Sequence, residues 1–170
     1  MGEYMLFRYY WIGCLLIFTG GAFAMNLNNI GKVCLFSQMT GVIYLNNKPV
    51  VRAKLIRTAD RDGAVIDEVF TDAHGHFEFP AVFERTMTKF LPQEFVASQK
   101  IIVLYDGKEY ELWNGVKRKP EENTESRGKP LIVKCELGAE RNYKRINGSP
   151  IFSLCDWDVE PDPKFDMELF

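Results

Sequence analysis

One stretch, Thr71-Asp72-Ala73-His74-Gly75-His76-Phe77-Glu78-Phe79, encodes a tight turn and the strand that follows it. Within the turn, Asp72 can accept backbone hydrogen bonds, and Gly75 supplies backbone angles that residues with a Cβ rarely adopt. Phe77 and Phe79 stand two residues apart, which places both side chains on one face of a strand. The stretch therefore predicts a turn that leads into a short strand with two buried phenylalanines.

The chain on both sides of this stretch repeats short apolar runs between turn signals, which is the pattern of an all-β protein. Strands are expected at residues 39–45, 50–58, 65–71, 77–79, 95–105, 109–114 and 131–137. No long amphipathic helix is visible. The predicted fold class is therefore all-β: a single antiparallel β-sandwich of about seven strands, with an irregular C-terminal tail. We place the sandwich domain at residues 39–137.

Two turns are expected to close hairpins between these strands, Asp60-Arg61-Asp62-Gly63 and Asp106-Gly107-Lys108, because each contains a Gly that tolerates positive φ. In the strand after the second turn, strict alternation puts Trp113 on the face opposite to Tyr110 and Leu112.

The N-terminus has the features of a secretory signal peptide at residues 1–24. An apolar run from Trp11 to Phe18 precedes Ala22-Phe23-Ala24, which is the A-x-A pattern that signal peptidase accepts. The run is too short to span about 30 Å of hydrocarbon comfortably. Cleavage would leave Met25 first and residues 25–38 as a lead into the sandwich, so we expect a periplasmic or secreted protein without a membrane span.

The composition favours one globular domain and argues against nucleic-acid binding. Removal of residues 1–24 from the 170-residue chain leaves enough length for one core, and aromatic residues make up 14% of the sequence. The net charge of −2 offers no general basic field for nucleic acid. Residues 138–170 are expected to form a tail that packs on the domain and has an acidic end.

Three cysteines remain after the signal segment: Cys34, Cys135 and Cys155. In an oxidising compartment this number indicates one disulfide and one remaining thiol, and three pairings are possible. We favour Cys135 with Cys155, because that bond would join the tail to the last strand of the sandwich. Cys34 with Cys155 is the second choice.

The pattern around the opening stretch resembles that of carboxypeptidase-regulatory-like domains, which are transthyretin-like β-sandwiches. The resemblance covers residues 40–82 and rests on Gly41-Val42-Ile43, Lys48-Pro49-Val50, Ala53-Lys54-Leu55 and Thr71-Asp72-x-x-Gly75-x-Phe77-x-Phe79. Such domains are usually non-catalytic accessory, adhesive or recognition modules, so the resemblance implies architecture more than function. Cys34-Leu35-Phe36-Ser37, the turn motif and Cys135 together also resemble small bacterial proteins, some of which look like immunity partners of type VI secretion toxins.

Few residues offer catalytic or metal chemistry. His74 and His76 are the only histidines, and an extended chain would put both on one side, with Asp72 and Glu78 as further ligand candidates. The turn already accounts for Asp72, so we expect no metal site. The sequence has no Gly-x-Ser-x-Gly elbow, and Cys34 has no histidine near it in the sequence. We therefore predict a protein without catalytic residues or cofactors.

Recognition of a protein partner is the function that this sequence favours. Residues 117–130 are almost entirely charged, Pro, Gly or small polar, so we expect a mobile loop there, and residues 83–92 read as a loop or one helical turn. Loops on a β scaffold can carry recognition, with aromatic anchors and basic side chains as the contacts. The candidate partner-binding residues are Phe90, Leu91, Trp113, Lys117, Arg118 and Lys119.

We expect a non-catalytic periplasmic protein-binding module. Its most concrete form is an immunity protein that neutralises a secreted bacterial toxin by stoichiometric binding in the cell envelope. The alternative is a structural, adhesive or carbohydrate-binding accessory domain of the envelope. The sequence leaves the partner, the oligomeric state and the location of the binding surface open.

Overall fold

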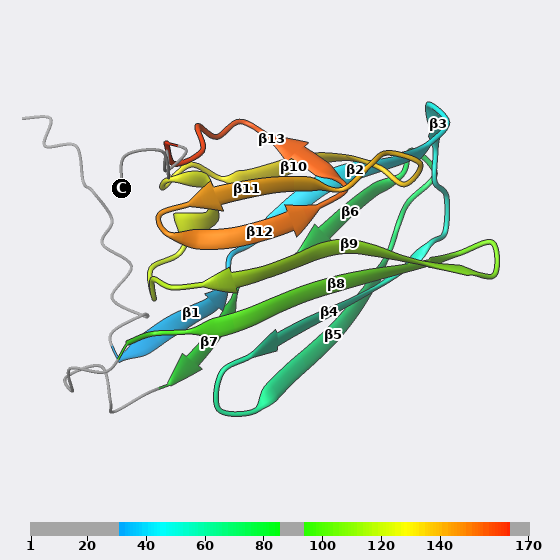
Figure 1. The fold of residues 1–170 in the computed structure, drawn as a ribbon. Helices are drawn as coiled ribbons and strands as arrows, with labels where there is room; N and C mark the ends of the chain where they lie inside the picture. Colours follow the sequence, from blue (N-terminus) through cyan, green and yellow to red (C-terminus); the bar gives the residue numbers. More distant parts are fainter. Residues whose placement is uncertain (1–30, 86–93, 164–170) are drawn as a thin grey trace, which may run out of the picture.

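The computed structural model describes residues 31–85 and 94–163 of the chain. Over these residues the protein consists of β-strands and one short 3-10 helix, as Figure 1 shows. The described part contains no helix that is long and apolar enough to cross a membrane. The predicted signal peptide at residues 1–24 lies outside the described residues.

The largest sheet has six strands, and every pairing within it is antiparallel. Its order is β11 (Asn142–Ile146), β12 (Ser149–Ser153), β9 (Lys108–Lys117), β8 (Ala97–Tyr105), β4 (Lys54–Asp60) and β5 (Ala64–Phe70). The two predicted hairpins are confirmed, since β4 pairs with β5 and β8 with β9 around the expected turns.

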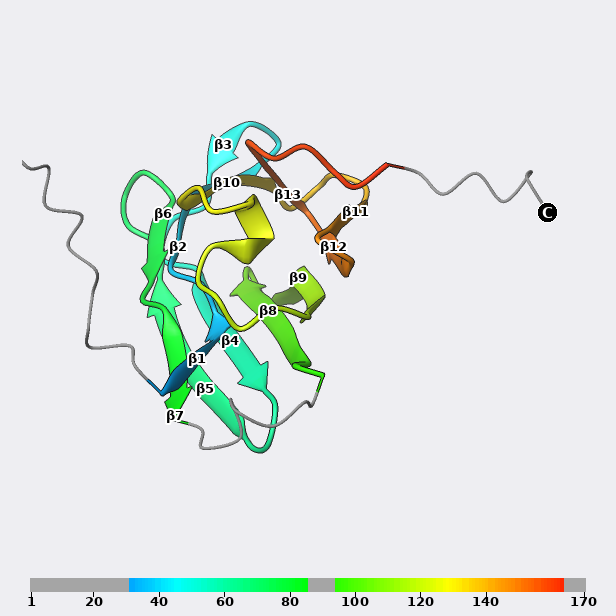
Figure 2. The ribbon, with the colours of Figure 1, turned by 90° about the vertical axis from the view of Figure 1, so that its left-hand side faces the viewer.

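A second sheet has the order β13 (Cys155–Trp157), β10 (Leu131–Glu136), β2 (Met39–Leu45) and β3 (Lys48–Pro49), and β6 (His76–Phe79) also pairs with β2. β1 (Lys32–Phe36) and β7 (Val82–Arg85) form a separate pair. Figure 2 shows the two larger sheets from one end of the molecule. Apolar side chains from both sheets form one buried cluster, which includes Met39, Ile43, Leu55, Ile101, Leu112, Val133 and Ile151.

The prediction of a single antiparallel sandwich of about seven strands is only partly right. The described residues are all-β, but their strands form three sheets, and β10 runs parallel to β2. Between β9 and β10 the chain leaves the six-stranded sheet and crosses to the other sheet through the 3-10 helix η3 (Thr124–Ser126), the kind of connection that a parallel pairing needs. The expected irregular tail instead contributes β11, β12 and β13.

The strand expected at residues 50–58 begins later, at Lys54. The chain changes sheet between β3 and β4, and Arg52 there has a φ of 57°, which is incompatible with a continuous strand. Within β4 buried and less buried side chains alternate, so that Leu55 and Arg57 point inward. The buried Arg57 guanidinium is held by two hydrogen bonds to Asp67 and lies 4.5 Å from the ring centroid of Phe79.

The turn before β6 forms as the sequence predicts. Asp72 Oδ1 accepts hydrogen bonds from the backbone N–H groups of His74, at 2.7 Å, and His76, at 2.9 Å. Gly75 has a φ of 78°, and a Cβ built there would lie 2.6 Å from the carbonyl oxygen of Ile43. Phe77 and Phe79 are both buried, as the alternation predicts.

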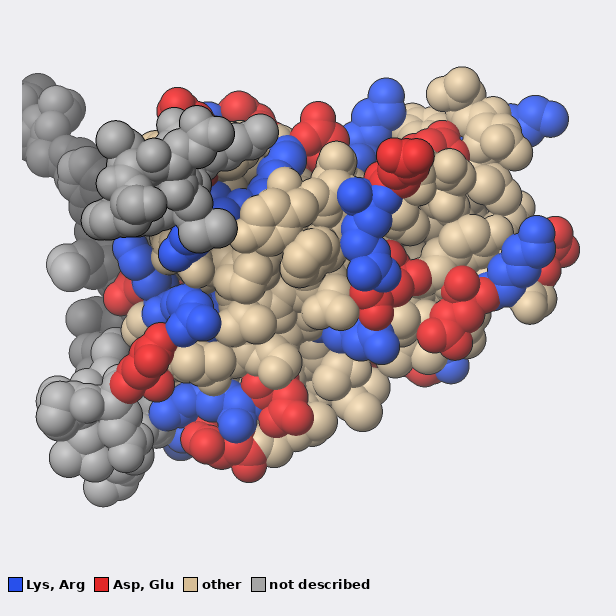
Figure 3. Space-filling model, in the orientation of Figure 1, with Lys and Arg blue, Asp and Glu red and all other residues tan. Residues whose placement is uncertain are grey.

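Charged side chains of both signs are interspersed on the face seen in Figure 3, with uncharged surface between them. Charged side chains also pair over the six-stranded sheet: Glu111 of β9 forms ion pairs with Lys100 of β8, at 3.5 Å, and with Arg141, which precedes β11, at 2.6 Å. Such pairs near the surface contribute little stability each, so the sheet is held mainly by its strand pairing and by the core.

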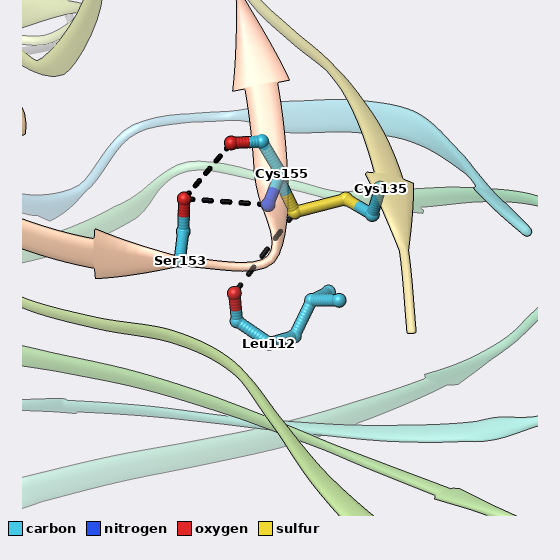
Figure 4. The surroundings of a disulfide bond; sticks show 4 residues. All are labelled: Leu112, Cys135, Ser153 and Cys155. Carbon is cyan, nitrogen blue, oxygen red and sulfur yellow. Dashed lines mark hydrogen bonds between the residues drawn. A yellow bond between two sulfur atoms is a disulfide. The ribbon is translucent and has the colours of Figure 1, made fainter. Parts of the chain in front are cut away.

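The disulfide joins Cys135 of β10 to Cys155 of β13, as the favoured pairing predicts. The two cysteines stand directly opposite each other in the antiparallel register, and both are buried (Figure 4). Ser153 accepts a hydrogen bond from the Cys155 N–H and donates one to the Cys155 carbonyl. Further along the tail, Asp162 pairs with Arg127 at 2.6 Å. The tail is therefore fixed to the domain by one covalent bond and by polar contacts.

Candidate functional site

The segment expected to be a mobile loop, residues 117–130, is anchored by a buried ion pair. Lys117, at the end of β9, and Glu125, in η3, are only 1% and 2% exposed, and Lys117 Nζ lies 2.6 Å from Glu125 Oε2. Lys117 also donates to Thr124 Oγ1 at 2.6 Å. The expectation of a loop without fixed structure and of a surface-exposed Lys117 is wrong, because these two charges neutralise each other inside the domain.

The Glu125 carboxylate is the centre of a polar network. It accepts hydrogen bonds from Ser37 Oγ at 2.6 Å and from Gln99 Nε2 at 2.7 Å. Burial alone would raise the pKa of Glu125, but the positive charge of Lys117 and the hydrogen bonds from Lys117, Ser37 and Gln99 outweigh it and hold the pKa below its usual value. The network thus keeps Glu125 ionised and connects η3 to β8 and to Ser37, the residue that follows β1.

Cys34 is the free cysteine of the described residues and lies beside this network, with its Sγ 4.0 Å from Ser37 Oγ. Burial raises the pKa of its thiol to about 12, against a smaller opposing effect of Lys117. The thiol is therefore protonated and buried at neutral pH, whereas nucleophilic attack requires an accessible thiolate. Cys34 acts as a small packing residue.

Trp113 is another candidate that lies inside the domain and not on its surface. Strict alternation fails in β9, because Ile101 pairs with Trp113 while Ile102 pairs with Glu111, which leaves Leu112 as a bulge. Leu112 and Trp113 are consequently both fully buried. The interpretation of Trp113 as an accessible anchor is wrong, since a buried ring cannot meet a partner.

The remaining partner-binding candidates are not gathered into one patch. Arg118 is exposed and forms an ion pair with Glu94 at 2.5 Å, and Lys119 is also exposed. Phe90 and Leu91 lie outside the described residues. The described candidates therefore divide between the core and a short exposed segment after β9.

The two histidines do not form a metal centre with their neighbours. Their ring centroids lie 6.1 Å apart, and His76 Nδ1 is 3.6 Å from Asp72 Oδ2. Among residues 31–85 and 94–163, no three His, Cys, Asp or Glu side chains are grouped so that they could hold a metal ion. The hydrogen bonds that Asp72 accepts from the N–H groups of His76 and His74 lower the pKa of its carboxyl, so this carboxylate stabilises the turn.

The described residues do form a concave surface elsewhere, over the outer face of the sheet that contains β2. A hollow of about 500 Å³ there adjoins a second hollow of about 210 Å³, and Thr40 and Ile132 line both. We call the two together the outer groove. Its lining residues are Gln38, Thr40, Gly41, Val42, Val69, Phe70, Asp72, His76, Phe77, Glu78, Glu122, Asn123, Pro130, Leu131 and Ile132.

The strand register explains why these side chains share one surface. Thr40 of β2 pairs with Glu78 of β6 on one side and with Ile132 of β10 on the other, so the three side chains form a row across the sheet. All three point away from the core, as their exposure shows. Phe70, at the end of β5, closes one side of the groove.

The outer groove is acidic and partly apolar. Three carboxylates line it, those of Asp72, Glu78 and Glu122, and its described lining includes no Lys or Arg. Two of the most exposed apolar side chains of the described residues are also there, Phe70 at 61% exposure and Ile132 at 63%. A surface with these properties suits a segment that carries positive charge and apolar side chains together.

A family model described as "Domain of unknown function (DUF6795)" matches residues 39–140. The chain belongs to the DUF6795 family. In this protein the DUF6795 match begins at the first residue of β2 and ends after β10, so it contains every lining residue of the outer groove except Gln38. None of the curated proteins matches the chain.

Sequence periodicity does not identify the outer groove. In β10 of the DUF6795 domain, Ile132 stands between two apolar residues, Leu131 and Val133, and an unbroken apolar run does not distinguish the buried from the exposed face. The register with β2 settles the question, because it places Ile132 on the outer face beside Thr40. The other outward positions, such as Glu78, come from a strand that the sequence identified correctly.

Proposed function

We propose that this DUF6795 protein is a non-catalytic binding module that holds a positively charged, partly apolar segment of a protein partner in its outer groove. The observation that carries the proposal is the set of three carboxylates and two exposed apolar side chains in one concave surface whose described lining includes no Lys or Arg. Complementary charge would speed the encounter, and burial of Phe70 and Ile132 would supply affinity.

The groove also offers recognition without a large structural change. Glu78 accepts a hydrogen bond from Gln38 at 2.9 Å, and Asp72 is fixed by the turn, so both carboxylates have defined positions before a partner arrives. A surface that is already arranged loses less entropy on binding than a flexible loop does. This argument favours the groove over the loop segments that the sequence suggested.

An immunity protein of the cell envelope is the more specific form of this proposal. The signal-peptide pattern at residues 1–24, the disulfide between Cys135 and Cys155 and the resemblance to small bacterial proteins that look like type VI immunity partners all support it. Disulfides persist in oxidising compartments such as the periplasm. The partner in this case is a secreted toxin whose basic segment enters the groove.

A carbohydrate-binding envelope domain is the second candidate, and one aromatic pair favours it. Tyr143 and Phe152 stand opposite each other on β11 and β12, are both exposed, and have ring centroids 4.9 Å apart. Exposed aromatic rings can stack on sugar faces. This candidate predicts binding at the outer face of the six-stranded sheet, away from the outer groove.

Nuclear magnetic resonance with simple probes separates these candidates. The probes are a heptapeptide that alternates Lys and Val, its counterpart with Glu in place of Lys, and a mixture of soluble oligosaccharides. We expect the Lys peptide alone to shift the backbone signals of Thr40, His76 and Ile132. Equal shifts with both peptides, or none with either, would contradict the proposal, and sugar-induced shifts at Tyr143 and Phe152 would favour the second candidate.

The immunity function is tested with the purified product of the adjacent gene, by calorimetry. Glu78→Lys and Ile132→Asp should each weaken binding at least tenfold, because one reverses a groove charge and the other removes its apolar contact. Glu140→Lys and Phe152→Asp are the matched controls, since both residues are exposed and lie outside the groove. If the wild type binds tightly and none of the four substitutions weakens binding, the interface lies elsewhere.

A further inference from the structure

β5 is an edge strand with unusual exposure. Among the described residues it pairs with β4 alone, and none of its seven residues is fully buried. Its exposed apolar side chains include Val65 at 43%, Ile66 at 65% and Phe70 at 61%. A long, apolar edge presents unpaired N–H and C=O groups to solvent and is a template for another strand.

The usual protections of an edge strand are weak here. β5 contains no Pro, and its register with β4 runs through seven consecutive pairs without a bulge. Its two charged residues are already paired within the sheet: Asp67 binds Arg57 through two hydrogen bonds, and Glu68 lies 2.6 Å from Lys54 Nζ. Neither charge is therefore left alone to repel an approaching strand.

We propose that two copies of this chain pair through β5, antiparallel, with Ile66 of one copy opposite Ile66 of the other. A twofold axis requires one residue to face its own counterpart. An axis at Asp67 or at Glu68 would place like charges directly opposite each other, which is destabilising. An axis at Ile66 instead brings together the Ile66 side chains of the two copies, which are the most exposed apolar side chains of β5. It also sets Ala64 of each copy opposite Glu68 of the other.

This register makes one continuous sheet from the two six-stranded sheets. The interface consists of one strand pair and the side chains on its two faces, which is less area than a stable dimer usually buries. The dimer is therefore weak and depends on protein concentration. The axis of this dimer lies at Ile66, which is not a lining residue of the outer groove; Val69 and Phe70, at the other end of β5, do line the groove.

Cysteine cross-linking tests the register directly. Ile66→Cys would bring two thiols to facing positions, with Cβ atoms about 5 Å apart, so oxidation should yield a covalent dimer. Glu68→Cys is the matched control on the same face of the same strand, where the two thiols would be four residues, or about 13 Å, apart along the strands. We expect at least tenfold more cross-linked dimer from Ile66→Cys than from Glu68→Cys.

Sedimentation velocity on the otherwise unmodified protein tests the dimer itself. We expect the average mass of the wild type to rise with concentration, and Ile66→Lys to abolish that rise without lowering the thermal midpoint. Ile132→Lys, an exposed apolar residue of another strand, should dimerise like the wild type. A wild type that stays monomeric at every concentration, equal cross-linking of both cysteine variants, or loss of the dimer only in Ile132→Lys would overturn the proposal.

Discussion

Replacement of Glu125 by Gln should destabilise the protein strongly, although Glu125 lies in a segment that the sequence suggests is irregular. The change removes the negative charge that stands 2.6 Å from Lys117 Nζ, at a site where both side chains are almost completely buried. Lys117 keeps its hydrogen bond to Thr124 Oγ1, but its charge loses its counter-ion. The new amide would also direct N–H groups toward donors such as Gln99 Nε2, which now bind the carboxylate.

The expected loss is about 3–5 kcal/mol in the free energy of unfolding, the range for a buried ion pair that loses one partner. For a domain of this size the loss corresponds to roughly 10–15 °C in thermal midpoint. The double variant Lys117→Met with Glu125→Gln removes both charges and leaves an acceptor for Ser37 and Gln99. It should therefore recover at least about 2 kcal/mol relative to Glu125→Gln alone.

Urea denaturation followed by tryptophan fluorescence measures these differences, because Trp113 and Trp157 pack against each other beside the network, with ring centroids 5.0 Å apart. Limited trypsin digestion gives a local readout, since the segment that the pair should protect contains Arg118 and Arg127, neither of which is followed by a proline. A Glu125→Gln variant within about 1 kcal/mol of the wild type would refute the reasoning, because that is the loss expected for an exposed pair. A double variant less stable than the single variant would refute it equally.

The remaining predictions concern acid, reduction and export. The folded-state pKa of Glu125 is lowered, so its ionised form contributes stability above its unfolded pKa of about 4.3. This contribution disappears as the pH falls through the folded pKa. In urea titrations, the stability of the wild type should therefore decline more steeply below about pH 4 than that of Glu125→Gln. Replacement of Cys135 and Cys155 by Ala should lower the free energy of unfolding by about 3 kcal/mol, the value for a loop of 20 residues. Thiol titration of the unreduced, denatured mature protein should find one free thiol, and a count of three would disprove the disulfide. The exported protein should begin at Met25, which N-terminal sequencing checks; a sequence that still starts at Met1 would exclude cleavage.

The local features of this protein follow from its sequence, because they depend on residues that are close together in the chain. Asp72 and Gly75 form a turn through backbone hydrogen bonds and a positive φ, which are properties of those residue types. The inward face of β4 follows from an alternation that needs no information about other strands. The sequence favours the pairing of Cys135 with Cys155 over two alternatives because it joins the tail to the last predicted strand, and the register of β10 with β13 confirms it.

The candidate site was decided by tertiary structure, because its parts meet only across distant segments. In the sequence, Lys117 and Glu125 belong to a charged stretch that is typical of an exposed loop. In the structure, the segment after β9 crosses between the sheets, and both side chains lie in the interior. Trp113 is buried by a bulge, a one-residue change of register that alternation cannot foresee. The outer groove joins β2, β6 and β10, and Thr40 of β2 stands 92 residues before its partner Ile132 of β10. The parallel and antiparallel pairing of these strands sets Glu78, Thr40 and Ile132 side by side. Sequence patterns fix which side chains share a strand face, whereas the order of strands in a sheet depends on long-range contacts, and that order determines which faces become a surface.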